Sequence, residues 1–174
     1  MKNKRGGIVA IEPQTGEILS LISAPSYDPD LLVGRKRSKN FNKLWYDTIA
    51  KPLYDRSLQA MYPPGSPFKT MTALIALQEN VIGTKERIDC HHGFSYGRAS
   101  RMKCHSHPSP LSMSPAIAHS CNAYFGKVYR RIIEKFDSPQ AGMDAWHDHL
   151  ASFGLGDFLG NDLPVGQPGR IPDA

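Results

Sequence analysis

The segment that most narrows the possible folds lies near the start of the chain. Residues 7–22 are typical of a β-hairpin, because two apolar runs rich in isoleucine flank the turn-forming residues EPQTGE. A two-stranded hairpin is not stable alone in water, and the sequence that follows is patterned as helices and loops. We therefore expect an α+β fold in which this hairpin is the edge of a sheet whose remaining strands are missing from the chain.

Helical patterns dominate residues 54–160, which we expect to form a mostly helical subdomain. Apolar residues recur with helical spacing after Ser66, over residues 123–136 and over residues 140–153. Between the first two of these helices, residues 83–110 are rich in glycine, histidine and proline and have no clear period. We expect a long ordered loop there, and such long connections are usually functional or held together by something.

Composition and charge pattern argue against a nucleic-acid partner and a membrane span. The 174 residues carry a net charge of +5, much of it in GRKRSKNFNK (residues 34–43), which we interpret as a solvated loop. No aromatic stacking platform or recognition-helix pattern accompanies these charges, so we expect no nucleic-acid binding. No run approaches the roughly 18 uncharged apolar residues of a membrane span. The basic first residues are followed by a strand pattern rather than by the apolar core of a signal peptide.

The stretch YPPGSPFKTMTALIAL, residues 62–77, contains the first candidates for chemistry. Ser66 and Pro67 would begin a helix well in any protein, because serine is a favoured N-cap and proline fits the first helical position. The same geometry also suits catalysis. Lys69 lies three residues after the serine, so its amine can reach the Ser66 hydroxyl. A lysine that is desolvated in a closed site can take the proton of a serine nucleophile. Taken alone, the stretch is compatible with both interpretations.

A second polar group precedes the helix expected at residues 123–136, in the segment AHSCNAYFGKVY. As structural residues, Asn122 would be a helix N-cap and Ser120 a turn residue. Residues two apart do not face each other in a helix. A Ser120–Asn122 pair that acts on one substrate therefore requires a loop or turn, which the helix start just after it permits.

Together, S-x-x-K at a helix start and S-x-N about 50 residues later resemble the motifs of the penicillin-recognising serine transpeptidases and β-lactamases. Longer segments resemble the transpeptidase domain of class B penicillin-binding proteins, the elongation-type penicillin-binding protein 2 in particular. These segments are GGIVAIEPQTGEILSLISAPSYDPD, KPLYDRSLQAMYPPGSPFKTMTALIAL, SCNAYF and FGLG. The resemblance covers nearly the whole chain. It implies a partial penicillin-binding (serine β-lactamase-like) fold, with residues 1–174 as the N-terminal portion of a transpeptidase domain.

The resemblance also implies a D,D-transpeptidase that works through a serine acyl-enzyme. Ser66 would attack the penultimate D-alanine carbonyl of a peptidoglycan stem peptide, and a neutral Lys69 would take its proton. Ser120 would pass that proton to the leaving D-alanine nitrogen, and Asn122 would hydrogen-bond Lys69 and the substrate amide. The backbone N–H of Ser66 would be one oxyanion donor. This chemistry requires no cofactor, and β-lactams would enter the same pathway and stall there.

The chain departs from the family pattern in one motif. K-[ST]-G, which in the family lies on the strand that lines the substrate cleft, is absent, and no lysine occurs after Lys135. We therefore expect a fragment that is itself inactive or nearly so. The family implies a full-length protein on the periplasmic side of the bacterial inner membrane, with a membrane glycosyltransferase as partner. We expect its membrane anchor to be absent from this chain.

Two other functions compete with the transpeptidase. A protein of the same fold that forms the acyl-enzyme without turnover would be a β-lactam sensor or an interaction module. A zinc-dependent scaffold would use the serines only as helix caps and turns. β-Lactamase activity fits less well, because no E-x-x-x-N segment follows that would position a hydrolytic water.

The exposed edge of the predicted sheet would also allow two copies of the chain to dimerise.

Cysteine and histidine are concentrated in the segment DCHHGFSYGRASRMKCHSHPSP. Thiolates and imidazoles are the usual zinc ligands, and a structural zinc would hold this loop together. Cys104 and His107 are the preferred ligands, with Cys90 third and one of the remaining histidines fourth. A Cys90–Cys104 disulfide, which the oxidising periplasm would allow, and free thiols are the alternatives.

Three further residues, one cysteine and two histidines, are not expected to bind metal. Cys121 lies between the two polar residues of the second motif and should face the core as a small apolar residue. His147 and His149 lie on different faces of the last predicted helix, so we expect both to be solvated.

Overall fold

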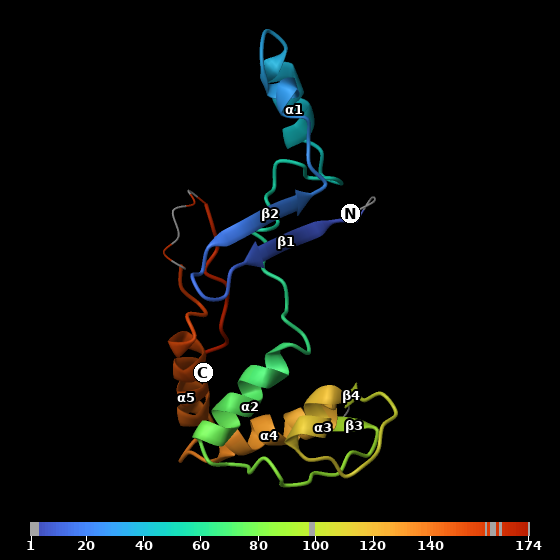
Figure 1. Cartoon of the computed structure of the whole chain (residues 1–174), viewed down its shortest axis with the longest axis vertical. Coiled ribbons are helices and arrows are strands. Elements are labelled where there is room, and N and C mark those ends of the chain that lie inside the picture. Colours follow the sequence, from blue (N-terminus) through green and yellow to red (C-terminus); the bar gives the residue numbers. More distant parts are fainter. Residues whose placement is uncertain (1–3, 98–99, 159, 161–162, 164, 174) are drawn as a thin grey trace. The chain divides into compact units, whose positions relative to one another are not determined.

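The computed structural model describes residues 4–97, 100–158, 160, 163 and 165–173. Its elements in chain order are β1 (Gly6–Ile11), β2 (Ile18–Ala24), a 3-10 helix η1 (Pro29–Leu32), α1 (Arg37–Trp45), α2 (Phe68–Gln78), β3 (Gly93–Tyr96), β4 (Ser100–Lys103), α3 (Met113–Ala118), α4 (Asn122–Glu134) and α5 (Pro139–Ser152) (Figure 1). They belong to two compact units. The first extends through Met61 and includes Phe158–Pro168, and the second comprises Tyr62–Asp157 and the residues from Gly169 onward. Within the described ranges, no helix is long and apolar enough to cross a bilayer.

β1 and β2 form a hairpin in the first unit. The strands pair antiparallel, with Gly6 opposite Ala24. Gly7 lies so close to the backbone of Ser57 that an added Cβ would be 2.9 Å from the Ser57 Cα, so this position requires glycine. The hairpin predicted over residues 7–22 is therefore confirmed, with slightly longer strands. Among the described residues its sheet has two strands.

Residues 34–43, which we expected to form a solvated loop, are largely helical. α1 contains no glycine, proline or β-branched residue, so nothing in it interrupts a helix. Asn40 Nδ2 donates to the carbonyl of Leu31 at 2.8 Å. Phe41 and Trp45, one turn apart, stack with their ring centroids 5.8 Å apart. The loop prediction is wrong because lysine and arginine are good helix formers even where few apolar residues accompany them.

The core of the second unit lies between α2 and α4, with α3 packed on α2 and α5 on α4 (Figure 1). The apolar face predicted for α4 is buried, and its largest fully buried side chains are Tyr124, Val128 and Ile132. Gly142 of α5 lies against the backbone of Ile133, where an added Cβ would be 2.3 Å from the carbonyl oxygen. The three long helices predicted for this unit are confirmed, and α4 and α5 end within two residues of their expected bounds.

The loop predicted over residues 83–110 contains a second short hairpin. β3 and β4 pair antiparallel, with Gly93 opposite Lys103, and both strands contact α4. The ring of Phe94 lies so close to Gly126 in α4 that an added Cβ would be 2.6 Å from the ring. The prediction is wrong over these strands, because four residues are too few for the alternation of a strand to be visible in the sequence.

Glu79 connects the C-terminal ends of three helices in the second unit. Its carboxylate accepts a hydrogen bond from Lys135 Nζ at 2.6 Å and lies 2.6 Å from His149 Nε2. Glu79 is the C-cap of α2, Lys135 is the C-cap of α4, and His149 is in the last turn of α5. The expectation that His149 is solvated is therefore wrong, since its side chain is 15% exposed. His147, at 41%, is more open to solvent.

Candidate active site

Ser66 lies in the turn that leads into α2. Gly65 has a φ of +65°, which glycine adopts readily. The N-cap position of α2 falls on Pro67, which provides no side-chain cap, so Ser66 is not the helix cap. The Ser66 hydroxyl is bonded to side chains instead. It accepts from Lys69 Nζ at 3.2 Å and from Ser120 Oγ at 2.8 Å.

The Lys69 amine is at the centre of the polar group. It extends from the first turn of α2, and Nζ lies 2.5 Å from Asn122 Oδ1, 2.8 Å from Ser120 Oγ and 2.7 Å from the Ser120 carbonyl oxygen. With Ser66 Oγ, four oxygens surround the Lys69 nitrogen, but even an ammonium has only three N–H groups to donate. If the amine is neutral, it has a lone pair that can accept a hydrogen bond from one of the two serine hydroxyls. An amine that accepts from a hydroxyl is placed to act as a general base.

The Ser120 backbone forms the turn that a Ser120–Asn122 pair requires. Its φ of +52° is in the left-handed region, which residues with a side chain rarely adopt. Asn122 is the first residue of α4, and its Nδ2 donates to the Lys103 carbonyl at 2.7 Å. The N-cap is Cys121, whose Sγ accepts the Tyr124 N–H at 3.3 Å. The predicted cap at Asn122 is therefore wrong, and its side-chain amide bridges the lysine and β4 instead.

Burial lowers the pKa of Lys69 below the ordinary lysine value, because removal from water disfavours the ammonium form. Negative charge on Cys104 and Cys121 would act in the opposite direction, and these effects are smaller. The net shift increases the fraction of neutral amine, which is the form that can take the proton of a serine hydroxyl.

The structure thus gathers the four predicted catalytic side chains into one hydrogen-bonded group. They come from the turn before α2 (Ser66), from α2 (Lys69), from the turn between α3 and α4 (Ser120) and from the start of α4 (Asn122). A proton on the Ser66 hydroxyl has a direct path to Lys69 and to Ser120. Such a group can activate a serine nucleophile and return the proton to a leaving group, which is the chemistry of acyl transfer. The Lys103 carbonyl was not predicted, since backbone atoms leave no sequence signal.

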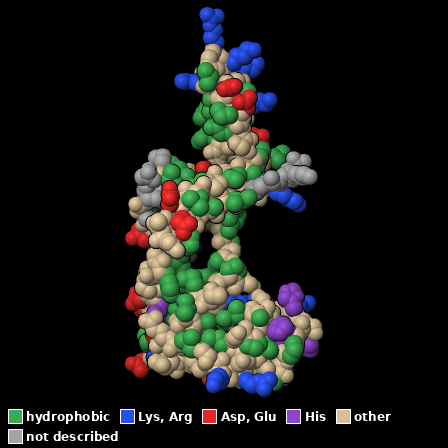
Figure 2. Space-filling view, viewed as in Figure 1, with side chains coloured by type: hydrophobic (Ala, Val, Ile, Leu, Met, Phe, Trp, Pro, Cys, Tyr) green, Lys and Arg blue, Asp and Glu red, His purple; other side chains and the backbone are tan. Residues whose placement is uncertain are grey.

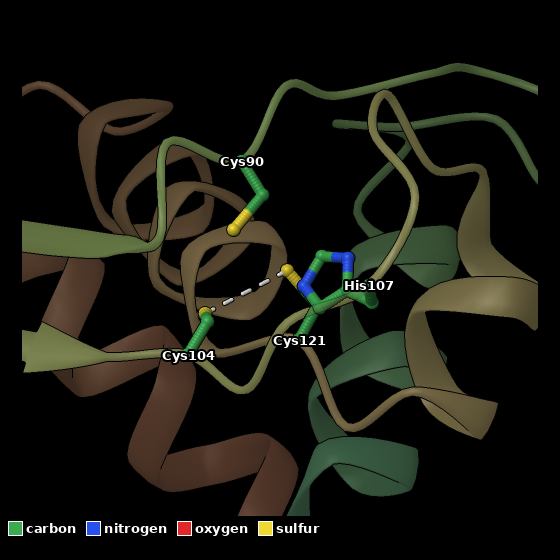
Figure 3. A group of neighbouring side chains, drawn as sticks. All are labelled: Cys90, Cys104, His107 and Cys121. Carbon is green, nitrogen blue, oxygen red and sulfur yellow. Dashed lines mark hydrogen bonds between the residues drawn. The ribbon is translucent and has the colours of Figure 1, made fainter.

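A second cluster adjoins this group. Cys90, Cys104, His107 and Cys121, here called the sulfur cluster, each offer a ligand atom within 4.8 Å of the others. Figure 3 shows the sulfurs of Cys104 and Cys121 facing each other, with Cys90 and His107 directed toward the same space. The two facing sulfurs are 4.0 Å apart. In a tetrahedral zinc site with Zn–S bonds of about 2.3 Å, two sulfurs lie about 3.8 Å apart. The donor types and their spacing therefore fit zinc.

The His107 ring is also suited to binding a metal. Its Nδ1 lies 2.7 Å from the carbonyl oxygen of Pro108, which only a protonated Nδ1 can satisfy. Nε2 is buried and has no hydrogen-bond partner among the described residues. A histidine that donates from one ring nitrogen to a carbonyl and keeps a lone pair on the other is the form that ligates metals.

The fourth member of the sulfur cluster differs from the prediction. We expected one of the remaining histidines, but His91, His92 and His105 are exposed, and Figure 2 shows histidine side chains on the surface of the second unit. Cys121 takes this place. It is buried as expected, at 1% exposed, but its sulfur faces the cluster. Burial raises the pKa of the Cys121 thiol to about 12. All three cysteines are free thiols in this structure. Cys121 was missed because it lies 17 residues after Cys104, outside the histidine-rich segment.

Known proteins resemble this chain over almost its whole length. Residues 6–174 match the family described as Penicillin binding protein transpeptidase domain. The chain is 33% identical to peptidoglycan D,D-transpeptidase MrdA of Acinetobacter baumannii, over 99% of this chain and 25% of that protein. It is 32% identical to peptidoglycan D,D-transpeptidase PbpA of Mycobacterium tuberculosis, over 87% of this chain and 30% of that protein.

Solved structures agree with these sequence matches. PBP2 of Pseudomonas aeruginosa superimposes with a TM-score of 0.82 at 30% identity, over 99% of this chain and 38% of that chain. PBP2 of Helicobacter pylori superimposes with a TM-score of 0.81 at 28% identity, over 99% of this chain and 31% of that chain. This chain spans 25% to 30% of the length of the two curated relatives. The resemblance to elongation-type class B proteins is confirmed, and the chain belongs to the penicillin-binding protein transpeptidase family.

Proposed function

We propose that this protein is a peptidoglycan D,D-transpeptidase, which cross-links stem peptides of the cell wall through a serine acyl-enzyme. The observation that carries the proposal is the position of Lys69 Nζ, within hydrogen-bond distance of Ser66 Oγ, Ser120 Oγ and Asn122 Oδ1. The relatives named peptidoglycan D,D-transpeptidases support it. So does the structure of penicillin-binding protein A from M. tuberculosis, which is an imipenem acyl-enzyme complex.

In the proposed acylation, Ser66 Oγ attacks the carbonyl of the penultimate D-alanine while Lys69 Nζ takes the hydroxyl proton. The oxyanion that forms accepts a hydrogen bond from the Ser66 backbone N–H. Ser120 Oγ, which bonds both Ser66 and Lys69, relays the proton to the leaving D-alanine nitrogen. The peptide C–N bond then breaks, leaving the donor peptide as an ester of Ser66.

In the second half of the reaction, the amine of a neighbouring stem peptide attacks this ester. Lys69 and Ser120 take the amine proton and return it to Ser66 Oγ as the ester bond breaks. Asn122, held between Lys69 and the Lys103 carbonyl, positions the lysine and has an amide edge for the substrate backbone. A β-lactam would acylate Ser66 by the same attack and remain attached.

The proposed substrate is a stem peptide ending in D-Ala-D-Ala, and the proposed location is the periplasmic side of the inner membrane. We also propose a membrane glycosyltransferase as partner in the cell. A peptidoglycan synthase complex that coordinates polymerisation and crosslinking supports such a partner. A complex of H. pylori PBP2 with MreC supports protein partners in general.

Turnover of a donor peptide tests the proposed function. A chain extended through a K-[ST]-G strand should release D-alanine from a D-Ala-D-Ala stem peptide and join the remainder to an amine acceptor. Ser66→Ala should abolish both products, while Ser114→Ala, at an exposed serine of α3, should retain them. A β-lactam sensor would react with penicillin but release no D-alanine. Release that survives in Ser66→Ala would contradict the proposal.

We propose in addition that the sulfur cluster holds a structural zinc ion. Its support is the donor set of three thiols and one imidazole within 4.8 Å. The buried His107 Nε2, which has no hydrogen-bond partner in the part of the chain that the structure describes, adds to it. When bound, zinc would tie the segments that carry Cys90, before β3, and Cys104 and His107, after β4, to the start of α4. The ion has no part in the acyl transfer itself.

Measuring the zinc content of the purified protein tests directly whether the sulfur cluster binds zinc. The purified chain should contain about one zinc per chain, and cobalt substitution should give the absorption of a tetrahedral thiolate site. His107→Ala and Cys90→Ser should weaken zinc binding strongly, whereas His105→Ala, at an exposed neighbour, should not. Equal affinity in His107→Ala and His105→Ala would rule out His107 as a ligand.

A further inference from the structure

Two sulfurs of the cluster hold the first turn of α4. The Ala123 N–H donates to Cys104 Sγ at 3.2 Å, and the Tyr124 N–H donates to Cys121 Sγ at 3.3 Å. The first N–H groups of a helix have no partner inside the helix, so these sulfurs supply acceptors that the turn would otherwise lack. The position of this turn therefore depends on where Cys104 and Cys121 place their sulfur atoms.

The same turn carries the part of the active site that contacts the lysine. Cys121 is flanked by Ser120 and Asn122, which both accept hydrogen bonds from Lys69 Nζ. Cys104 directly follows Lys103, whose carbonyl accepts from Asn122 Nδ2 at 2.7 Å. Cys121 is thus the residue before Asn122, and Cys104 is the residue after the one whose carbonyl holds the Asn122 side chain.

The distance between the two sulfurs differs between their chemical states. As thiols they are 4.0 Å apart, which is close to the separation of about 3.8 Å in a tetrahedral zinc site. A disulfide bond is about 2.05 Å long. Disulfide formation would therefore shorten this distance by about 2 Å, and a misplacement of about 1 Å is enough to impair catalysis.

We propose that Cys104 and Cys121 are a redox pair that controls the active site, with two mutually exclusive states. In the reduced state both sulfurs are free to bind metal and to hold the α4 turn. In the oxidised state a Cys104–Cys121 disulfide excludes the metal and displaces Asn122 from Lys69. Only the final effect on acylation rests on the proposed transpeptidase function.

The oxidation step requires a disulfide-containing oxidant, such as oxidised glutathione or the disulfide form of an oxidoreductase. The thiolate of one cysteine attacks the oxidant, forming a mixed disulfide and releasing one thiolate. The second cysteine then attacks the mixed disulfide, forming the Cys104–Cys121 bond and releasing the second thiolate. The two cysteines lose two protons and two electrons, and the oxidant is reduced to two thiols.

Disulfide mapping tests the pair. The chain is treated with oxidised glutathione after removal of metal by a chelator, and in parallel after loading with zinc. Without metal, the intact mass should fall by two hydrogens and peptide mapping should find Cys104 linked to Cys121. With zinc bound, the same treatment should leave the thiols free. A cross-link that involves Cys90, no cross-link in the metal-free chain, or equal oxidation with and without zinc would overturn the proposal.

Two variants serve as matched controls. Cys90→Ser removes the third thiol and should still form the cross-link. Cys121→Ser removes one partner and should not, while serine at that position remains a good N-cap and keeps the chain folded. A loss of two hydrogens in Cys121→Ser equal to that of the unaltered chain would contradict the assignment of this pair.

Hydrogen exchange and penicillin labelling then measure the effect on the active site. The amides of Ala123 and Tyr124 should exchange about fivefold faster in the oxidised chain, the factor that corresponds to a lost cap of about 1 kcal/mol. Unchanged exchange would show that the disulfide does not reach the α4 turn and would overturn the coupling. If exchange changes as expected but the reduced chain, extended through K-[ST]-G, does not react with penicillin, the proposed function fails while the redox pair stands.

Discussion

At the scale of single residues, the candidate site depends on the position of one lysine amine. The spacing of S-x-x-K predicted that Lys69 reaches Ser66, and the structure has Nζ 3.2 Å from Oγ. The sequence indicated only that Ser120 and Asn122 can act together if a loop or turn lies there. It could not predict that turn, because a left-handed φ at a serine has no sequence signature. The cluster position of Cys121 could not be predicted at all, since a buried cysteine reads the same whether it packs in a core or faces other thiols.

The lowered pKa of Lys69 predicts how acylation of Ser66 depends on pH. The amine must be neutral to take the serine proton, so the rate should rise with pH as Lys69 loses its own proton. Because burial lowers this pKa, the rate should level off below the pH at which an ordinary lysine titrates. Penicillin-labelling rates of the extended chain between about pH 6 and pH 11 measure this. A rate that still rises through the ordinary lysine range would contradict it.

Replacing the base tests the same residue independently of pH. Lys69→Arg keeps the positive charge but cannot lose a proton near neutral pH. The labelling rate of the extended chain should fall by about 10²–10⁴-fold, the usual contribution of a general base. Lys127→Arg, at a lysine that donates to the Asp89 carbonyl, is the matched control and should react at the original rate.

At the scale of elements, long helices were predictable and short or polar ones were not. α4 and α5 have several turns of apolar spacing, which identifies a helix from the sequence. α3, β3 and β4 have six residues or fewer, too few for a period to stand out. α1 was missed for another reason, since none of its residues is buried and its sequence has no broad apolar face.

The cap of α4 gives a prediction at this scale. Cys121 Sγ accepts the Tyr124 N–H, and serine can accept the same bond whereas alanine cannot. In the presence of a chelator, Cys121→Ala should therefore lower the free energy of unfolding by about 1 kcal/mol more than Cys121→Ser. Urea unfolding followed by circular dichroism measures both. Equal stability of the two variants would show that the cap contributes nothing.

The close contact between α4 and α5 gives a second prediction about the elements. An added Cβ at Gly142 would be 2.3 Å from the Ile133 carbonyl oxygen, and backbone cannot move aside as a side chain can. Gly142→Ala should therefore lower the free energy of unfolding by about 1–3 kcal/mol. Gly83→Ala, where an added Cβ has nothing within 4 Å, is the control. The prediction fails if both variants unfold at the same urea concentration.

At the scale of the whole molecule, the sequence predicted the α+β class and the family. It could not predict how the helices of the second unit are held together at their ends. The Glu79 group depends on residues 56 and 70 positions apart in the chain. No local pattern relates residues at such separations, so only packing brings Glu79, Lys135 and His149 together.

This group predicts a loss of stability in acid. The hydrogen bond from Lys135, followed by that from His149, lowers the pKa of Glu79 below the ordinary glutamate value. A carboxyl whose folded pKa is lowered stabilises the fold above its unfolded pKa, and this stabilisation is lost as pH falls through the lowered folded value. Urea unfolding between neutral and strongly acidic pH should show a smaller loss in Glu79→Gln than in the unaltered chain. Parallel curves for the two would contradict the assigned role.

Ser66, activated by Lys69, is the residue that we expect to become acylated. The intact mass of the protein after incubation with a penicillin tests this, for this chain and for one extended through a K-[ST]-G strand, each with and without Ser66→Ala. We predict one adduct per extended chain, mapped to Ser66 and lost in the variant, with little or none on the shorter chain. An adduct that persists in Ser66→Ala, or an extended chain that does not react, would contradict the assignment of Ser66 as the nucleophile.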